Sequence, residues 1–251
     1  YKYLPIISPM YQSLKRWANS KIYYGNSVFC FACSHSFKSW LHGKDNGTCP
    51  YCGSGTRHRM LCSYLESRYS PRHYPIKVLH FAPNWGQEYW FRRQPHKFQY
   101  VTTDLSSPGV DVHSDITNLP FDDESFDMIV CCHVLEHIPQ DYKAIEEIFR
   151  VLCKNGDAFI QVPYARNAEQ TDEDPSVADP AERARRCVQF DHVRTYGRDI
   201  VDRLRVPGFQ VEVVNLAQTY SSEEIRRLGF WDDTIFACHK GQAFHATATQ
   251  L

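Results

Sequence analysis

The 251-residue sequence contains no hydrophobic run long enough to cross a membrane. A helix that spans a bilayer needs roughly 18 or more consecutive apolar residues, and no stretch here approaches that length. The first residues also lack the pattern of a signal peptide. The chain opens at Tyr1 rather than at methionine, which is compatible with a preceding segment. These absences predict a protein without a membrane partner.

Internal repeats and low-complexity tracts are absent as well, and the ten cysteines do not have the layout of a disulfide framework. Four of them form two Cys-x-x-Cys pairs, while Cys131, Cys132 and Cys153 fall in apolar segments. Disulfide-rich frameworks are typical of small secreted domains, and paired cysteines in a reducing compartment more often bind metal. We therefore expect a cytoplasmic protein, with disulfide pairing as the alternative.

The paired cysteines predict a zinc site. Cys30 and Cys33 form the first pair and Cys49 and Cys52 the second, with 15 residues between the pairs. Two such turns supply four thiolates, which complete a tetrahedron around Zn²⁺ and close its coordination sphere. The zinc is therefore expected to be structural rather than catalytic. Three nearby residues offer alternative ligands: His35, His42 and Cys62.

A net charge of −1 hides an uneven distribution along the chain. Residues 1–74 carry ten Lys and Arg against two Asp and Glu, whereas the remainder carries eighteen against twenty-seven. A basic segment either docks on an acidic neighbour or contacts a polyanion such as RNA. Within it, Arg57, His58 and Arg59 are placed to bind phosphate at a helix start or to form a solvated turn.

Apolar strand-like runs alternate with helical patterns from residue 76 onward, which predicts an α/β fold. With 43% hydrophobic residues, the chain can bury one such domain and a small appendage. We expect strands at residues 76–81, 98–103, 110–112, 126–132, 157–162, 210–214 and 234–238. We expect helices at residues 59–69, 87–93, 141–152, 180–187 and 196–205, and Asn155-Gly156 as the stop after the third.

Three ordered motifs follow: D-x-x-x-L-P-F from Asp115, S-F-D from Ser125 and H-V-L-E-H from His133. With them, residues 76–240 resemble the class I S-adenosylmethionine (SAM) methyltransferases of the small-molecule type 11. The L-H-F-A-P loop, the preceding zinc site and a D-H-V-R motif resemble a mostly bacterial subgroup. The resemblance implies a Rossmann-like sheet that ends in an antiparallel hairpin.

The resemblance also implies a SAM site at the carboxyl ends of the strands. The family's glycine-rich loop aligns with His80, Ala82, Asn84 and Gly86, so only one glycine is present. Asp104 is expected to hold the ribose hydroxyls and Asp115 the adenine amino group, with a turn or cap role as the alternative for each. The predicted SAM-binding residues are His80, Phe81, Ala82, Pro83, Gly86, Asp104, Leu105, Asp115, Ile116, Cys132 and His133.

Residues 164–195 form a long polar insert after a central strand, which predicts a lid or substrate wall. Asp191 and His192 are a candidate base for a substrate hydroxyl or amine, and His133 or His137 is another. Arg194 and Tyr196 are expected to bind substrate. A structural role in closing the insert is the alternative for the D-H-V-R motif, and an architectural role is the alternative for His133 and His137.

Four parts are therefore expected. An extension spans residues 1–29, the zinc unit and a connecting helix 30–74 with a linker at 69–74, the methyltransferase domain 75–240, and a tail 241–251. The expected function is SAM-dependent methylation of a small polar acceptor. The alternatives are an RNA methyltransferase that uses the basic zinc unit, and a non-catalytic zinc-ribbon adaptor. The oligomeric state is left open.

Overall fold

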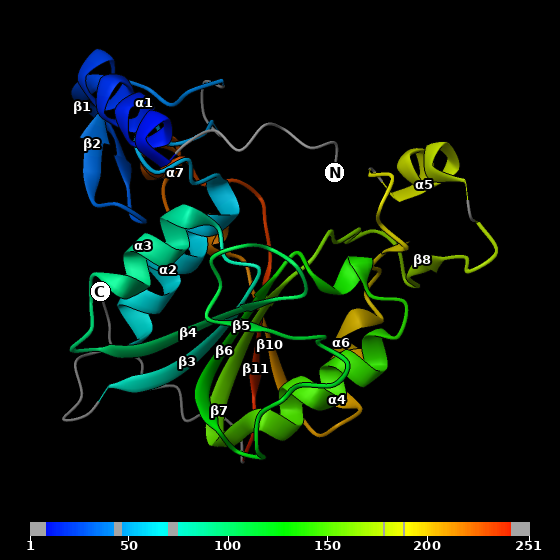
Figure 1. Ribbon diagram of the computed structural model, residues 1–251. Helices are drawn as coiled ribbons and strands as arrows, with labels where there is room; N and C mark the ends of the chain where they lie inside the picture. The colour runs from blue at the N-terminus through cyan, green and yellow to red at the C-terminus, as the bar shows by residue number, and fades with distance from the viewer. Residues whose placement is uncertain (1–8, 43–46, 70–74, 178, 188, 242–251) are drawn as a thin grey trace. The chain divides into compact units, whose positions relative to one another are not determined.

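The computed structural model describes residues 9–42, 47–69, 75–177, 179–187 and 189–241 (Figure 1). The chain forms two compact units. The first, which we call the cysteine unit, comprises residues 1–71, 84–94 and 215–233. The second, the sheet unit, comprises residues 72–83, 95–214 and 234–251. Most of the predicted linker at 69–74 and of the tail at 241–251 lies outside the described residues.

The sheet unit is built on a seven-stranded sheet in the order β10-β11-β7-β6-β3-β4-β5. The strands from β7 to β5 are parallel, and β11 is antiparallel to both of its neighbours. This confirms the predicted Rossmann-like class and its closing hairpin. The strands are β3 (Ile76–Phe81), β4 (Phe98–Asp104), β5 (Val112–His113), β6 (Phe126–Cys132), β7 (Leu152–Gln161), β10 (Gln210–Val214) and β11 (Ile235–His239).

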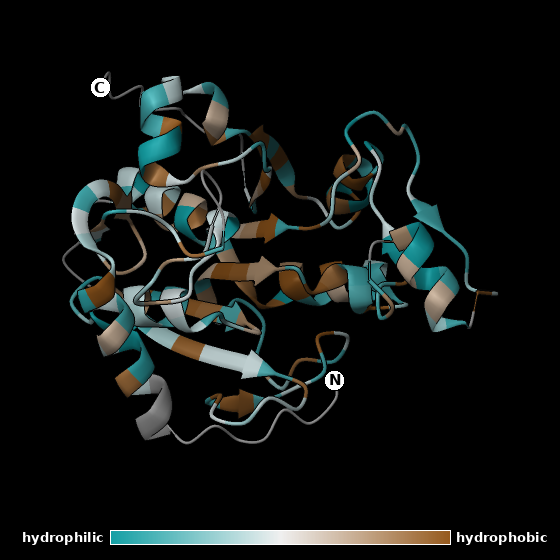
Figure 2. Cartoon of the chain, turned by 90° about the horizontal axis from the view of Figure 1, so that it is seen from above, coloured by the Kyte–Doolittle hydropathy of each residue, from teal (hydrophilic) through white to brown (hydrophobic). Residues whose placement is uncertain are grey.

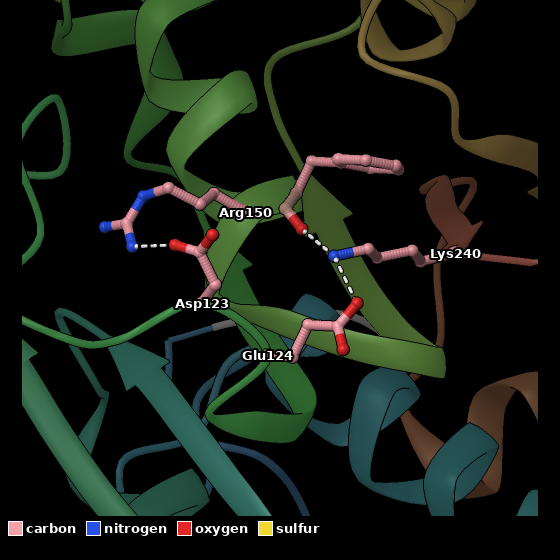
Figure 3. A pocket seen from close by; sticks show the side chains of 5 residues that line it. Asp123, Glu124, Arg150 and Lys240 are labelled. Atoms are coloured by element: carbon pink, nitrogen blue, oxygen red, sulfur yellow. Dashed lines mark hydrogen bonds and ion pairs between the residues drawn. The ribbon is translucent and has the colours of Figure 1, made fainter.

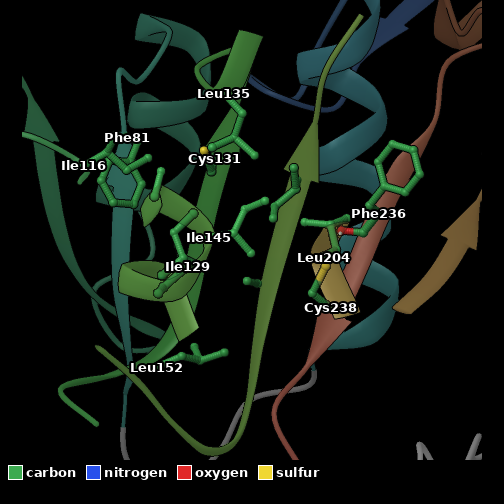
Figure 4. Close-up of a cluster of buried hydrophobic side chains, with 14 of the residues drawn as sticks. Phe81, Ile116, Ile129, Cys131, Leu135, Ile145, Leu152, Leu204, Phe236 and Cys238 are labelled. Atoms are coloured by element: carbon green, nitrogen blue, oxygen red, sulfur yellow. Dashed lines mark hydrogen bonds between the residues drawn. The ribbon is translucent and has the colours of Figure 1, made fainter. Parts of the chain in front are cut away.

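The central strands are apolar because both of their faces are buried. In β6 only Asp127 is partly exposed, and in β3 only Lys77. Strands covered on both faces read as continuous hydrophobic runs, which is the pattern seen here (Figure 2). Helices α4 (Asp141–Val151) and α6 (Ile200–Arg205) lie side by side and pack on the sheet (Figure 1). Their buried side chains join those of the strands in one hydrophobic core (Figure 4).

The predicted helix stop at Asn155-Gly156 is wrong, and β5 lies at Val112–His113 rather than at residues 110–112. Helix α4 ends at Val151 and β7 begins at once with Leu152, so Asn155 and Gly156 lie inside the strand instead of stopping the helix. The pairing of β6 with β7 shifts register here. Asn155 has a φ of 60°, and a Cβ on Gly156 would come within 2.9 Å of the Asp127 carbonyl oxygen. A β-bulge needs such residues, which sequence alone does not distinguish from a helix stop.

The predicted insert 164–195 contains α5 (Pro180–Cys187), which has the predicted bounds, and a short hairpin. The hairpin pairs β8 (Asp172–Glu173) with β9 (Arg194–Thr195). Because β9 continues into a bridge between Tyr196 and Tyr164, helix α6 begins at Ile200 rather than at Tyr196.

The cysteine unit combines a hairpin with helices. Strands β1 (Tyr24–Cys30) and β2 (His35–Phe37) pair antiparallel. Its helices are α1 (Pro9–Ile22), α2 (Thr56–Arg68), α3 (Trp85–Arg92) and α7 (Ser222–Leu228), and it also contains the short 3₁₀ turn η2 (Leu216–Gln218). A second 3₁₀ turn, η1 (Leu135–His137), belongs to the sheet unit. Helix α1 falls in a segment for which the sequence shows no clear period. No helix in the described part of the chain has the length and apolar character to span a bilayer.

Candidate functional site

The carboxyl edge of the sheet contains a topological switch point between β3 and β6. From β3 the chain continues outward to β4 and β5 on one side, and from β6 to β7 on the other. Ligands of open α/β sheets bind in the crevice at such a point. Ala82 follows β3 with a φ of 46°, and His133 follows β6 with a φ of 56°. Non-glycine residues in this left-handed region cost free energy and cluster at functional sites.

Two predicted ligands of SAM lie at this edge, and each has one oxygen committed to a turn. Asp104 ends β4, and its Oδ1 accepts from the backbone N–H groups of Ser106 at 2.8 Å and Ser107 at 2.7 Å. Oδ1 of Asp115 accepts from the N–H and the hydroxyl of Thr117, both at 2.8 Å. These bonds lower the pKa of Asp115. The turn role and the ligand role are compatible, because each carboxylate has a second oxygen for a ligand.

Around these acids the edge offers both apolar and polar groups. Leu105 is 71% exposed beside Asp104, whereas Ile116 is buried in the core cluster. Cys132 donates through its Sγ to Oε1 of Gln161 at 3.2 Å. Nε2 of Gln161 is buried and makes no hydrogen bond within the described residues. Sequence reasoning missed Gln161, although it is the one polar residue that ends the apolar run of β7.

His80 occupies the position where related loops carry an acid. It is fully buried in β3, and its Nδ1 lies 2.8 Å from the Tyr100 hydroxyl oxygen. Burial lowers the pKa of His80 to about 3. The side chain is therefore neutral near pH 7, and it packs inside the sheet. Its predicted contact with the cofactor stays a prediction, and that contact would be uncharged.

The buried His80 predicts a pH-dependent stability. Between about pH 3 and pH 6.5 the unfolded chain protonates this histidine and the folded chain does not. The free energy of unfolding should therefore fall with decreasing pH, by up to about 1.4 kcal/mol per pH unit from this group. Between pH 7 and pH 5, the free energy of unfolding measured by urea titration should fall by about 2 kcal/mol less in His80→Gln than in the wild type. Equal losses would contradict the prediction, and the exposed His113→Gln serves as the control.

In the cysteine unit, the four predicted metal ligands form one buried cluster. Their Sγ atoms all lie within 4.8 Å of one another. Sγ of Cys30 is 3.6 Å from Sγ of Cys52, and Sγ of Cys33 is 3.7 Å from Sγ of Cys49. Sulfurs at about 2.3 Å from a tetrahedral zinc are about 3.8 Å apart, and a disulfide bond would need about 2.05 Å. The cluster therefore fits a tetrahedral metal, and the four cysteines form no disulfide bonds in this structure.

A buried arginine accompanies the cluster. Arg59 is fully buried in α2, with its guanidinium 4.0 Å from the centroid of the Trp40 ring. Its N–H groups donate to four backbone carbonyls, those of Gly47, Ser54, Leu228 and Gly229. Burial lowers the pKa of Arg59, and the four cysteines oppose that shift. Four thiolates around a Zn²⁺ ion would carry a net charge of −2, and the guanidinium would offset part of that buried negative charge.

This placement separates Arg59 from its neighbours in the sequence. Arg57 is exposed, and its Nε lies 3.3 Å from Nε2 of His58, whose Nδ1 accepts from the Gly55 N–H. Arg59 points into the unit, so it is neither a phosphate ligand at the surface nor part of a solvated turn.

Gly86 packs against the cysteine cluster in this structure. It lies in the first turn of α3, where the side chain of Asn84 accepts from its N–H at 2.9 Å. A Cβ on Gly86 would overlap Oγ of Ser54 and come within 3.1 Å of Sγ of Cys52. Ser54 itself accepts a hydrogen bond from Cys52. The need for a glycine here is thus explained within the cysteine unit, and the predicted contact of Gly86 with SAM stays a prediction.

Gly86→Ala is therefore expected to destabilise the cysteine unit. Overpacking of this kind typically costs about 1–3 kcal/mol, because Ser54 must move and its bond to Cys52 is lost. Gly55→Ala is the matched control, since its Cβ would meet nothing closer than 3.9 Å. Thermal unfolding of both variants measures the difference. Equal melting temperatures would show that α3 tolerates a methyl group at this contact.

The candidate bases lie at the end of β6 and on the segment that follows α5. Nδ1 of His133 is 3.0 Å from Oε1 of Glu136. Nδ1 of His137 is 3.2 Å from the carbonyl oxygen of Asp191. His192 is buried, with a lowered pKa because of that burial, and its ring lies 4.7 Å from the ring of His137. The structure thus brings together the histidines of the H-V-L-E-H and D-H-V-R motifs.

The predicted substrate ligands Arg194 and Tyr196 are both buried in a network of charges. Nε of Arg194 donates to Glu173 at 2.7 Å, and the Tyr196 hydroxyl donates to Asp141 at 3.0 Å. Arg203 bridges Asp141 and Glu173. The remaining bonds of the Arg194 guanidinium go to the carbonyls of Leu135, Ile138 and Pro139. A contact with substrate would require Arg194 to leave these partners, and it stays a prediction.

A pocket with a volume of about 510 Å³ lies at the opposite edge of the sheet. Its charged groups already pair with one another or with carbonyls: Arg150 with Asp123 at 2.8 Å, and Lys240 with Glu124 at 3.6 Å and with the Phe149 carbonyl at 2.9 Å (Figure 3). Open α/β sheets bind ligands at the carboxyl ends of their strands, and this pocket is at the amino ends. It is therefore not the candidate cofactor site.

Comparison with known proteins agrees with the geometry. A family model described as a methyltransferase domain matches residues 86–160. A demethylmenaquinone methyltransferase of Clavibacter sepedonicus is 42% identical over 49 residues, which are 20% of this chain and 20% of the relative. The similarity thus spans about a fifth of the length of that curated protein.

Solved structures share the fold. The [4+2]-cyclase SpnF superposes with a TM-score of 0.54 at 14% identity, over 92% of this chain and 94% of its own. A 1,6-didemethyltoxoflavin-N1-methyltransferase of Burkholderia thailandensis superposes with a TM-score of 0.50 at 14% identity, over 73% of this chain and 78% of its own. Identities this low show the fold alone. The sheet order and these superpositions show an α/β Rossmann-like methyltransferase fold, and the methyltransferase family model matches residues 86–160 within it.

Proposed function

We propose that the sheet unit binds SAM at its switch point and transfers the methyl group to a small polar acceptor. The observation that carries this proposal is the arrangement of Asp104 and Asp115. Each ends a strand or turn at the carboxyl edge, with Oδ1 held by neighbouring N–H groups. A carboxylate fixed in this way presents its other oxygen in a defined direction, as recognition of ribose and adenine requires.

When bound, SAM supplies the methyl group from its sulfonium. The residues of this chain orient and shield it. Asp104 accepts from the ribose hydroxyls, Asp115 accepts from the adenine amino group, and the exposed Leu105 provides an apolar contact. His80 is a buried, neutral group within β3, so recognition of the methionine ammonium must come from other residues.

A base completes the site where the acceptor is a hydroxyl or a protonated amine. His133 and His192 are the candidates for removing that proton, with Asp191 near the second of them. His133 is held by Glu136 through Nδ1, and its Nε2 is buried without a hydrogen bond within the described residues. The low pKa of His192 keeps it neutral near pH 7, as a base must be.

The small acceptor is supported by the type of methyltransferase that the motifs resemble. The Burkholderia thailandensis structure with this fold holds 1,6-didemethyltoxoflavin and S-adenosylhomocysteine. In the cysteine unit we propose a structural Zn²⁺ on Cys30, Cys33, Cys49 and Cys52, because their spacing fits a tetrahedron. Four protein ligands leave the ion no open position for catalysis.

Calorimetric titration of the zinc-loaded chain with SAM tests the proposal first. We expect micromolar binding, and an absence of binding would favour the non-catalytic adaptor. Incubation with methyl-labelled SAM and fractionated extract then identifies the acceptor class. A label that enters RNA, with an affinity that falls steeply with salt, would replace the small acceptor with RNA.

A further inference from the structure

Three side chains outside the four-cysteine cluster form a second group of potential metal ligands. They are Glu136 and His137, from the turn η1 after β6, and His192, from the segment between α5 and β9. One donor atom from each lies within 4.8 Å of the others. The Val193 N–H donates to the Glu136 carbonyl at 2.9 Å, which fixes the two segments against each other.

Both histidines are oriented as metal ligands usually are. Nδ1 of His192 lies 2.9 Å from the carbonyl oxygen of Cys187. Nδ1 of His137 lies 3.2 Å from the carbonyl oxygen of Asp191 and 3.5 Å from its carboxylate. A carbonyl oxygen only accepts, so Nδ1 carries the proton in each ring and Nε2 carries the lone pair. Ligating histidines typically donate their other N–H to a carbonyl or carboxylate in this way.

The carboxylate of Glu136 also indicates a bound cation, independently of the two histidines. Its side chain is fully buried, and Oε1 is held by His133 at 3.0 Å. Oε2 is also buried and makes no hydrogen bond within the described residues. A buried carboxylate oxygen without a partner is costly, because it has lost its water and gained nothing in return. A cation bound to Oε2 would compensate that cost.

We propose that Glu136, His137 and His192 bind a divalent first-row transition metal, for which Zn²⁺ is the simplest probe. Two imidazoles and one carboxylate are a common ligand set for such ions, and three protein ligands leave open positions for water or a substrate oxygen. Donor atoms around one tetrahedral ion are about 3.4 Å apart, so a small rotation of the side chains is needed. The site is separate from the four-cysteine cluster, and its metal content can be measured without SAM.

The metal changes how the candidate bases are assigned. With Nε2 of His192 on the ion, that histidine is a ligand and does not accept a proton from substrate. His133 then remains as the base candidate and also holds Glu136 in place. The hydrogen bonds of Asp191 and Cys187 position the two ligand rings.

Metal content of the full chain, dialysed against Zn²⁺ and measured by mass spectrometry, tests the proposal. We expect about two zinc ions per wild-type chain and about one in Glu136→Gln, His137→Asn and His192→Asn. The exposed His113→Asn is the matched control and should retain two. The His137 side chain is partly exposed, so of the three replacements this one should disturb the fold least. Thermal unfolding checks that each variant is folded.

Loading with Co²⁺ provides a second readout, since a four-thiolate site gives intense sulfur-to-metal absorption and a nitrogen–oxygen site does not. Two bound ions with only one thiolate-type spectrum support the proposal. One zinc ion in the wild type and in all variants would overturn it, and the three residues would then be a packed group that binds no metal. SAM titration of the same samples separates this result from the proposed function, because loss of either binding leaves the other measurable.

Discussion

Removal of metal from the four-cysteine cluster is expected to unfold the cysteine unit. The thiols that it would leave crowd one another in a buried site, with sulfur–sulfur distances of 3.6 and 3.7 Å. Structural zinc contributes an apparent binding free energy of about 10–16 kcal/mol in small domains, which equals or exceeds the stability of most domains. Without the ion, Arg59 also loses the negative charge that its buried guanidinium offsets.

Cys49→Ser is the variant that tests this most directly. It should release the metal, abolish the near-ultraviolet circular dichroism of the aromatic residues around the cluster and lower the melting temperature sharply. Cys62→Ala is the matched control, because Cys62 is buried in α2 of the same unit and lies outside the cluster. Loss of metal from Cys62→Ala would instead support the alternative ligand. Unchanged melting of the wild type in a strong chelator would contradict a structural metal.

Asp104→Ala should weaken SAM binding about 10- to 100-fold. Hydrogen bonds to a charged group are worth about 1.5–3 kcal/mol each, and Asp104 is assigned to the ribose hydroxyls. The alanine also removes the acceptor for the N–H groups of Ser106 and Ser107, so the turn after β4 loosens. A second variant is needed to separate these two effects.

Asp104→Asn makes that separation. Its side-chain oxygen can still accept from the turn N–H groups, while the charge and one acceptor oxygen are lost. We expect weaker SAM binding in both variants by calorimetry, with near-normal stability in Asp104→Asn. Asp122→Ala removes an exposed acid from the turn before β6 and should leave the affinity unchanged. Wild-type affinity in both Asp104 variants would remove the ribose assignment.

Much of the sheet unit could be predicted because its signals are local. Strands β6 and β10 and helix α5 have the predicted bounds. A continuous apolar run indicates a strand buried on both faces, wherever that strand sits in the sheet. The start of α6 and the bulge in β7 could not be predicted, because each depends on a pairing with a distant segment.

Some candidate site residues could likewise be predicted from local patterns, and others could not. The four cysteines, Asp104 at the end of β4 and Asp115 after β5 are visible in the sequence, because metal spacing and strand ends are short-range patterns. Whether a side chain is buried cannot be predicted from such short-range patterns. Arg194 resembles an anion-binding group in sequence, yet the structure places it in a buried network with Glu173.

The sequence by itself determined the α/β class, the two cysteine pairs and the order of the methyltransferase motifs, because each is set by residues close together in the chain. Only the tertiary structure decided that Gly86 packs on Ser54, that Arg59 binds the carbonyls of Leu228 and Gly229, and that His192 meets Glu136. These contacts join segments that lie tens to more than a hundred residues apart. They form only when distant segments pack together in the folded chain, and no local pattern of residue types predicts that packing.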